Sequence, residues 1–210
     1  LSGYHIKESQ ANGALMRISP LGIFGANFPL EVVAKWAVED AKLTHVNLVC
    51  LQVNALYAMA ISETIKHALT PEQVYLHILE WADEMQVEQC IKEQVLLAKH
   101  SVPEDFVDKQ GWVLLAFRNA LYQLLHADST EQGIIDTVNR GGDTDTNAAI
   151  CGALLGAVYG RRSIPERWVK QLLCCRPMEG LVNVKRPRPP CYWPVDVLIV
   201  AERLLQAGQG

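Results

Sequence analysis

Two aspartates separated by one threonine, Asp143 and Asp145, are followed directly by Thr146. Their carboxylate and hydroxyl oxygens are hard donors of the type that Mg²⁺ and Mn²⁺ select in proteins. The preceding pair, Gly141 and Gly142, can bend the backbone so that the three donors converge, which leaves other coordination positions for water and substrate. The spacing therefore indicates a divalent metal site, and the alternative is simple capping of a helix.

The two acids stand at the start of a segment that favours a helix over residues 145–160. Small residues recur there at every fourth position, namely Ala148, Gly152, Gly156 and Gly160. This repeat lines one helix face with minimal side chains and permits a neighbouring backbone to come close. Negative charge is stabilised at a helix N-terminus, where Thr144 or Thr146 can also serve as a cap. We therefore expect a central helix whose first turn carries the acids.

Helical periodicity dominates the rest of the chain. The clearest start signal is TPEQ at 70–73, where Thr70 can cap, Pro71 suits the first turn and Gln73 can reach back to the cap. Strand-like alternation is nearly absent, so the sequence predicts an all-α fold. Besides 145–160, the expected helices span residues 29–42, 47–67, 71–86, 88–99, 111–126, 129–138, 165–173 and 194–207.

Composition narrows the class of protein. The chain has 210 residues, of which 50% are hydrophobic, so we expect one globular domain over residues 1–210 with a real core. The net charge of −4 gives no bulk attraction to phosphate backbones or anionic lipid, which makes nucleic acid an unexpected partner. The longest apolar runs, such as 148–159, are shorter than the roughly 20 residues of a membrane span, so no membrane partner is expected.

Six cysteines are scattered along the chain without a CxxC or Cys/His pattern. They are Cys50, Cys90, Cys151, Cys174, Cys175 and Cys191. This spacing gives little support for a zinc site or a disulfide scaffold and favours reduced thiols in a cytoplasmic protein. The basic run KRPRPP at 185–190 is expected to form a solvated loop rather than a phosphate or partner site.

The segment GGDTDTNAAICGALLGAVYG, residues 141–160, resembles the C-terminal signature of the ADP-ribosylglycohydrolase family. This family includes dinitrogenase reductase-activating glycohydrolase and the ADP-ribosyl-acceptor hydrolases. Further segments resemble family elements in the same order along the chain. They are NGALMRISPLGIF at 12–24, LTHVN at 43–47, RSIPERW at 162–168 and YWPVD at 192–196.

The resemblance implies an all-α orthogonal multi-helix bundle with a two-metal site, usually for Mg²⁺ or Mn²⁺, in a central cleft. It implies that Asp143, Asp145 and Thr146 are metal ligands, in agreement with their donor chemistry. It also implies that Asn12 and Gly13 lie in a loop at the ADP-ribose cleft, where Gly13 lets the backbone approach the ligand. An ordinary turn would explain this Asn-Gly pair as well.

The resemblance extends the expected substrate-binding set to Gly141, Gly142, His45 and Trp112. His45 matches the cleft histidine of the family, although the proline that often follows it is replaced here by Val46-Asn47; a C-terminal helix cap is the alternative role. Trp112 stands where the family tends to carry an aromatic residue near the adenosine, and core packing is its alternative role.

The largest departure from the family lies at the start of the chain. Family members carry an upstream Gly-Asp-x-x-Gly segment and a Thr-Asp-Asp-Thr run, which supply further metal ligands and the acid thought to direct water. Neither occurs here, so no catalytic residue is assigned and the chain is expected to be the C-terminal part, about two-thirds, of an N-terminally incomplete domain. The acidic pairs at 39–40, 83–84 and 104–105 are expected to be solvated. Arg17 is expected to have a structural role, such as pairing with an interior acid, and contact with a phosphate is the alternative.

These expectations predict a metal-dependent hydrolase that cleaves the glycosidic bond between ADP-ribose and a modified acceptor, with Mg²⁺ or Mn²⁺ as cofactor. The activity would require the missing N-terminal ligands, so an N-terminal fragment or self-association is expected besides ADP-ribose or an ADP-ribosylated protein as partner. The alternative is a catalytically inactive relative that binds ADP-ribose or has a structural role. Within the family the acceptor linkage can be to arginine, serine, a nucleic-acid end or a small molecule, and these residues do not select one.

Overall fold

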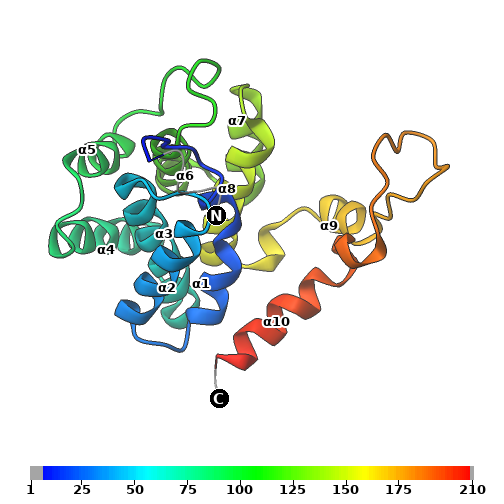
Figure 1. Ribbon diagram of the computed structural model, residues 1–210, viewed down its shortest axis with the longest axis horizontal. Coiled ribbons are helices and arrows are strands. Elements are labelled where there is room, and N and C mark those ends of the chain that lie inside the picture. Colours follow the sequence, from blue (N-terminus) through cyan, green and yellow to red (C-terminus); the bar gives the residue numbers. More distant parts are fainter. Residues whose placement is uncertain (1–6, 209–210) are drawn as a thin grey trace.

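A computed structural model describes residues 7–208, and the fold of these residues is all-α, as predicted (Figure 1). Their only extended pairing is an isolated bridge between Ala11 and Trp112. Short 3-10 turns accompany the helices. The α-helices are α1 Ser19–Gly25, α2 Leu30–Lys42, α3 Leu48–His67, α4 Pro71–Glu84, α5 Gln89–Ala98, α6 Val113–His126, α7 Thr130–Asn139, α8 Thr144–Tyr159, α9 Glu166–Leu173 and α10 Val197–Ala207.

The helix α3 forms the centre of the bundle. It is in contact with α1, α2, α4, α6 and α8, and it carries fully buried side chains such as Leu56, Tyr57 and Ile61. The Tyr57 hydroxyl donates to the carbonyl of Ile150 at 2.6 Å, which ties α3 to α8. By length and composition α3 could cross a membrane, but 78% of its most apolar window is buried against the other helices, as in the core helix of a globular domain.

The helix α8 packs on α6 and α7 through buried residues that include Ile150, Leu154 and Leu155. The expected close approach of a backbone along its small-residue face is wrong. A Cβ at Gly152 would lie 3.1 Å from a side-chain atom of Ile134 in α7, and a Cβ at Gly156 would meet nothing within 4 Å. The small residues therefore accommodate one side chain of α7 and otherwise leave the face open.

Most helix boundaries agree with the sequence prediction to within a few residues, and the capping box of α4 is confirmed. Thr70 accepts from the amide of Gln73, whose side chain accepts from the amide of Thr70. The helix α1 was not predicted, because two glycines lower helix propensity within its seven residues. Those glycines let α1 lie tightly against its neighbours: a Cβ at Gly22 would lie 2.8 Å from Ile61 of α3.

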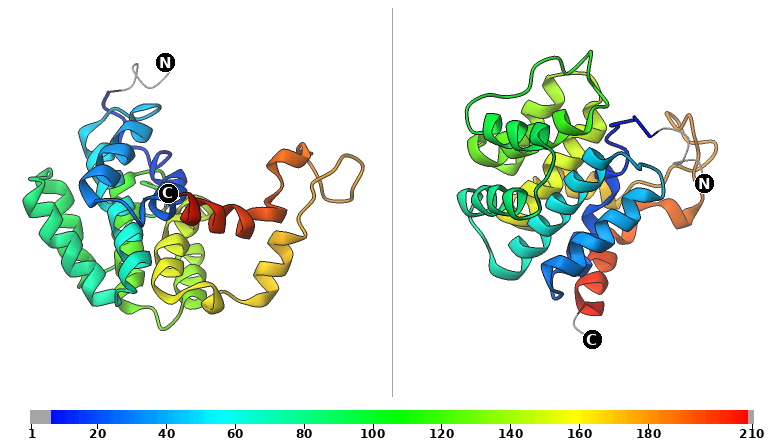
Figure 2. Two further views of the ribbon diagram at one scale, coloured as in Figure 1. Left: turned by 90° about the horizontal axis from the view of Figure 1, so that it is seen from below. Right: turned by 60° about the vertical axis from the view of Figure 1, so that its left-hand side comes forward.

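Residues 161–207, here called the C-terminal arm, lie beside the body formed by α1–α8 (Figures 1 and 2). The arm leaves the body after α8 and returns at its far end, where Asn27 donates to the carbonyl of Leu205 at 3.3 Å. Neither α9 nor α10 contains a buried residue. The basic run at 185–190 is exposed in this arm, as predicted.

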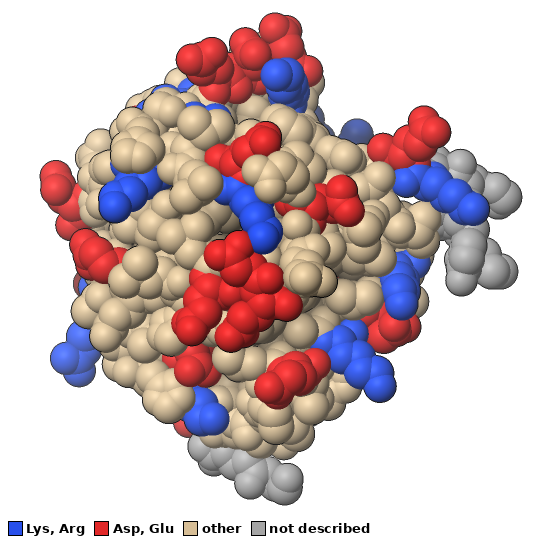
Figure 3. All heavy atoms as spheres, turned by 90° about the vertical axis from the view of Figure 1, so that its left-hand side faces the viewer, with Lys and Arg blue, Asp and Glu red and all other residues tan. Residues whose placement is uncertain are grey.

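Charged side chains are unevenly placed on the body. Acidic side chains form a cluster on the face that looks to the left in Figure 1, where α4 and α5 lie (Figure 3). This face offers negative charge, the opposite of the basic surface that binds phosphate backbones.

Candidate active site

The turn that leads into α8 is held in a left-handed backbone conformation. Gly141 and Gly142 have φ angles of +79° and +70°, which glycine adopts freely and residues with a Cβ avoid. Asp143 follows as the residue that flanks the helix, and its carbonyl accepts from the amide of Asn147 at 3.0 Å. The glycine pair therefore provides the bend that brings the first acid to the start of α8.

No side chain caps the N-terminus of α8. The prediction of a threonine cap is wrong, because Thr144 is already the first helical residue and the Thr146 hydroxyl donates to the sulfur of Met16 at 3.9 Å. Asp143 occupies the cap position without a side-chain bond to the helix, and Asp145 is exposed in the first turn. The carboxylates of both acids thus remain available for contacts outside α8.

Asn12 holds the Asp143 carboxylate from across the fold. Its carboxamide nitrogen donates to Asp143 Oδ2 at 2.9 Å and lies 3.5 Å from Asn147 Oδ1. Only 6% of Asn12 is exposed, so these bonds replace those to water. The structure therefore places the predicted Asn12 against a predicted metal ligand and orients one of its two carboxylate oxygens.

Asn147 is a member of this cluster that sequence reasoning missed. It is fully buried one turn into α8, and its Nδ2 has no hydrogen-bond partner among the described residues. The available signal was a lone amide four residues after Asp143 in a helix otherwise rich in alanine and glycine. Burying an amide group costs free energy unless its polar atoms form hydrogen bonds. In Asn147 the Oδ1 atom forms such a bond, since it accepts from Asn12.

His45 lies beside Gly13, and the missing side chain at Gly13 makes room for it. A Cβ there would lie 3.0 Å from His45 Cε1 and 3.3 Å from Nε2. On the other edge of the ring, Thr44 Oγ1 lies 2.8 Å from Nδ1 and also accepts from Arg17 at 2.7 Å. The Thr44 hydroxyl proton can therefore go to Nδ1, and we assign the ring proton to Nε2.

The electrostatic surroundings favour a neutral His45. Burial is the main cause that lowers its pKa below the usual 6.5, and the charge of Arg17 lowers it further. The imidazole is consequently uncharged near neutral pH and presents an N–H donor on the side of Gly13. The backbone of His45 also closes α2, since its amide donates to the carbonyl of Ala41 at 2.7 Å.

Arg17 pairs with an acid, as expected. It donates to Asp40 Oδ2 at 3.1 Å, to the Asp40 carbonyl at 2.8 Å and to the Gly13 carbonyl at 3.3 Å. Asp40 is therefore not the solvated acid that the sequence suggested. With 32% and 34% of the two side chains exposed, the ion pair stabilises the fold little, and its main effect is to join the loop at Gly13 to α2.

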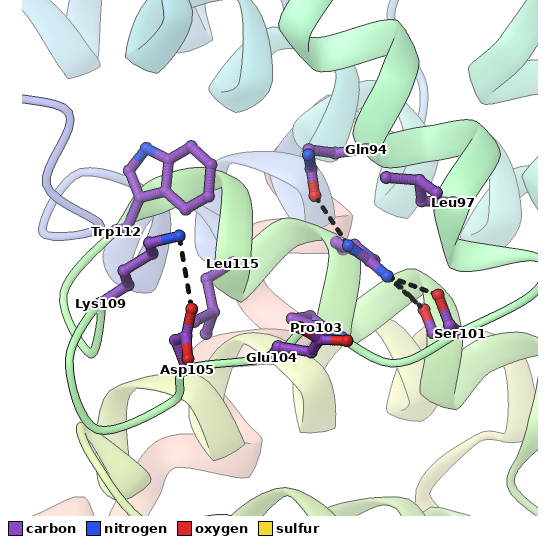
Figure 4. A pocket seen from close by; sticks show the side chains of 10 residues that line it. Gln94, Leu97, Ser101, Pro103, Glu104, Asp105, Lys109, Trp112 and Leu115 are labelled. Carbon is purple, nitrogen blue, oxygen red and sulfur yellow. Dashed lines mark hydrogen bonds and ion pairs between the residues drawn. The ribbon is translucent and has the colours of Figure 1, made fainter.

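Trp112 is joined to the segment that precedes Asn12. Its indole nitrogen donates to Gln10 Oε1 at 2.8 Å, and the carbonyl of the preceding Gly111 accepts from the Asn12 amide at 2.9 Å. The half-buried ring lines a cavity of about 390 Å³ between α5, α6 and the loop that joins them, as Figure 4 shows. Trp112 is thus joined to the segment of Asn12 and packs partly against the core, but the cavity that its ring lines is lined by no other predicted site residue.

The chemistry of the donors fits a hard divalent cation. Asp143 keeps one carboxylate oxygen free of Asn12, and Asp145 and Thr146 follow within one turn of α8. In residues 7–208 no three Asp, Glu, His or Cys side chains come together as a metal cluster. Asp143 and Asp145 are therefore not joined by a third side chain of these four types among the described residues.

Comparison with known proteins places this arrangement in context. A family model described as ADP-ribosylglycohydrolase matches residues 2–191. The chain is 26% identical to ADP-ribosylhydrolase ARH3 of Bos taurus over 196 residues, covering 77% of this chain and 53% of that protein. It is 24% identical to ADP-ribosyl-[dinitrogen reductase] glycohydrolase of Rhodospirillum rubrum over 165 residues, covering 77% of this chain and 50% of that enzyme.

A solved structure, titled ADP-ribosylglycohydrolase-related protein complex, has the same fold with a TM-score of 0.78 at 23% identity. The likeness covers 96% of this chain and 62% of that one, and the chain spans about half the length of the curated relatives it matches. The family model extends over the loop of Asn12, over His45 and over the acid turn of α8 alike. On the strength of that match, the chain belongs to the ADP-ribosylglycohydrolase family.

Proposed function

We propose that this chain forms the ADP-ribose-binding, metal-holding part of a hydrolase that cleaves the glycosidic bond between ADP-ribose and a modified acceptor. The observation that supports this most directly is the bond from Asn12 to Asp143, together with the contact of Gly13 with His45. Asn12 and Asp143 are separated by 131 positions in the sequence and are joined by this bond at the start of α8. Both residues lie within the part of the chain that the family model matches.

In this proposal Asp143, Asp145 and Thr146 hold Mg²⁺ or Mn²⁺. When bound, such an ion would orient substrate hydroxyls and stabilise the charge that develops as the glycosidic bond breaks. Asn12 fixes the rotamer of the Asp143 side chain through Oδ2, as partners behind metal ligands commonly do. No residue of the chain is assigned to direct the attacking water.

The remaining site residues would bind the substrate. His45 presents its Nε2 proton on the side of Gly13 and would donate to an oxygen of the ADP-ribose group. The half-buried ring of Trp112 would stack on the base, since an aromatic ring that is partly exposed at a cavity offers such a face. Each of these contacts orients the substrate relative to the acid turn of α8.

Activity in this proposal depends on further polypeptide. The chain spans about half of its relatives, and the C-terminal arm exposes apolar side chains that include Val182 at 88%, Ile199 at 53% and Val200 at 44%. Apolar surface of this kind is normally covered. An N-terminal fragment or a second copy of the chain would cover it, and the fragment would also supply the remaining ligands.

One observation favours the alternative of a relative that binds ADP-ribose without cleaving it. The described residues bring together no third acidic, histidine or cysteine side chain beside Asp143 and Asp145. Such a protein would bind ADP-ribose and Mn²⁺ but release no ADP-ribose from a modified protein. Mass spectrometry of an ADP-ribosylated protein after incubation separates the two functions, because only the hydrolase removes the modification.

The metal role is tested by calorimetric titration with Mn²⁺. We expect Asp145→Asn to weaken Mn²⁺ binding by about tenfold or more while the far-UV circular dichroism stays unchanged. Asp196→Asn is the matched control, because Asp196, like Asp145, is an exposed acid at the start of a helix. Unchanged Mn²⁺ affinity in Asp145→Asn would show that this acid is not a ligand.

The dependence on further polypeptide is tested separately by intact-mass spectrometry and light scattering of the purified protein. A second polypeptide that copurifies, or a dimer of this chain, is the expected result. A monomer that removes ADP-ribose without any partner contradicts this part of the proposal.

A further inference from the structure

The loop between α5 and α6, residues 99–112 and here called the strap, contacts both the segment of Asn12 and the turn before α8. Its start is held by Arg118 of α6, which donates to the Ser101 carbonyl at 2.9 Å, to the Ser101 hydroxyl at 2.7 Å and to the Val102 carbonyl at 3.1 Å. Its end is held at Gly111, whose carbonyl accepts from the Asn12 amide. The strap thus begins on α6 and ends on the segment that carries Asn12.

The strap borders a cavity along part of its length, and only Pro103 and Phe106 of its residues are buried. The cavity of about 390 Å³ lies between the strap and the helices α5 and α6, and Leu97 of α5 and Leu115 of α6 are among the residues that line it. Contacts that a filled core would supply are missing there. The position of the strap is therefore set by a small number of anchors rather than by continuous packing.

The middle anchor is Phe106. The residues on either side of it are exposed, from Glu104 to Asp105 and from Val107 to Gln110, whereas only 6% of Phe106 is exposed. Its ring lies under the guanidinium of Arg140, 5.6 Å from the ring centroid. Arg140 is fixed in turn by Asp136, to which Nη2 donates at 2.6 Å.

Phe106 also contacts the turn before α8 through its backbone. A Cβ at Gly142 would overlap the carbonyl oxygen of Phe106, so the strap fills the space that a side chain at 142 would need. Phe106 consequently contacts the turn from Arg140 to Asp143 at two points. Its ring lies against Arg140, and its carbonyl lies against Gly142, the residue before Asp143.

We propose that Phe106 is a positioning residue that holds the turn of Gly141–Asp143 against Asn12. The strap connects the two sides of the site, since Gly111 binds Asn12 and Phe106 binds the turn that leads into Asp143. Without the Phe106 ring, the strap loses its middle anchor and the turn is free to move relative to Asn12. The consequence for metal binding rests on the proposed function, whereas the mechanical role of Phe106 does not.

The mechanical role is tested by hydrogen exchange of the amides of Arg140, Gly141 and Thr144, which donate to Thr137, Val138 and Gly142 at 3.3, 3.2 and 3.0 Å. We expect Phe106→Ala to raise their exchange rates by about tenfold and to leave the core of α3 unchanged. Phe106→Leu keeps an apolar side chain over the turn and should restore most of the protection.

Phe117→Ala is the matched control, because Phe117 is a fully buried phenylalanine in the core of α6. It should speed exchange in α3 and leave the turn at 140–144 unaffected, the reverse of the Phe106→Ala pattern. Gly142→Ala is the reciprocal variant: its methyl group displaces the Phe106 carbonyl, so it should free the same amides, and it is decisive if Phe106→Ala does not fold. Unchanged exchange at 140–144 in the folded variants overturns the proposal.

Calorimetry with Mn²⁺ extends the test to the site. We expect Phe106→Ala to weaken Mn²⁺ binding by about tenfold and Phe106→Leu to recover it. If neither the wild-type protein nor any variant binds Mn²⁺, the metal role in the proposed function is wrong, while the exchange result for Phe106 still stands or falls by itself. If Phe106→Ala binds Mn²⁺ as tightly as the wild type although its turn exchanges freely, then Phe106 holds the turn but does not affect metal binding.

Discussion

Two apolar helices, α8 in the body and α10 in the C-terminal arm, have opposite surroundings. Five residues of α8 are buried, because α3, α6 and α7 surround it, whereas α10 has none and touches mainly α1. Both segments read as helices in the sequence. The sequence therefore predicted that both segments are helical. It did not predict that α8 is buried in the core and α10 is not, because burial depends on how many helices pack around each one.

The largest expected difference between body and arm is in thiol reactivity. Burial raises the pKa of Cys151 to about 12, and its side chain is inaccessible in α8, whereas Cys174, Cys175 and Cys191 are exposed in the arm. Labelling of Cys151 requires unfolding, so its rate should be at least about a thousandfold lower than that of the arm thiols. Mass spectrometry of labelled peptides over time measures this ratio, and rapid labelling of Cys151 would contradict the packing of α8.

Side-chain truncation should separate the two regions by several kcal/mol. Phe117→Ala removes a fully buried ring from the body and should lower the free energy of unfolding by about 3–5 kcal/mol. Ile199→Ala removes a side chain that is 53% exposed in α10 and, in the monomeric chain without a partner, should change it by no more than ~0.5 kcal/mol. Denaturant unfolding of both variants gives the values. A large loss in Ile199→Ala would show that the arm is covered by another chain in solution.

A smaller contrast is expected for two hydrogen bonds of the same type. Tyr57 donates to the Ile150 carbonyl at 2.6 Å inside the body, and Trp193 donates to the Arg188 carbonyl at 2.9 Å on the exposed arm. Tyr57→Phe should cost about 1 kcal/mol, because a buried acceptor loses its donor. Trp193→Phe should cost under ~0.5 kcal/mol, since water replaces the lost donor. Equal losses in thermal unfolding would mean that the arm excludes water as the body does.

The smallest expected effect is a pH dependence confined to the body. All six histidines precede residue 127, so none lies in the arm. Burial and Arg17 lower the pKa of His45 below 6.5, so the unfolded chain binds more protons just below that pH and stability is lost as the pH falls through this window. Melting temperatures between about pH 7.5 and about pH 5.5 should fall less in His45→Gln than in the wild type. An identical pH dependence in both would exclude this contribution.

The sequence predicted those features that depend on local chemistry. The capping box of Thr70 and Gln73 was confirmed because it is contained within four residues. The helix α1 was missed because its glycines are favoured by contacts with α3, which lie far along the chain. The pairing of Arg17 was expected, but its partner Asp40 was identified only when the fold brought α2 beside it.

The candidate site followed the same division. Donor type and spacing pointed to Asp143, Asp145 and Thr146, whose role as ligands stays a prediction. The contributions of Asn147 and Phe106 depend on the residues that face them across the fold. The lone amide in α8 was the only local signal for Asn147, and no pattern in its own segment indicates the role of Phe106. Family resemblance supplied Asn12 and His45, while the structure added the partners that orient them.

The obstacle at position 142 is a main-chain oxygen, and this restricts how the protein can evolve. When a substitution clashes with a side chain, a second substitution that shrinks the neighbour can restore the fit. A peptide carbonyl is present whatever residue occupies position 106, so no replacement there relieves a clash at 142. Replacing this glycine therefore requires the main chain of the strap to move at Phe106.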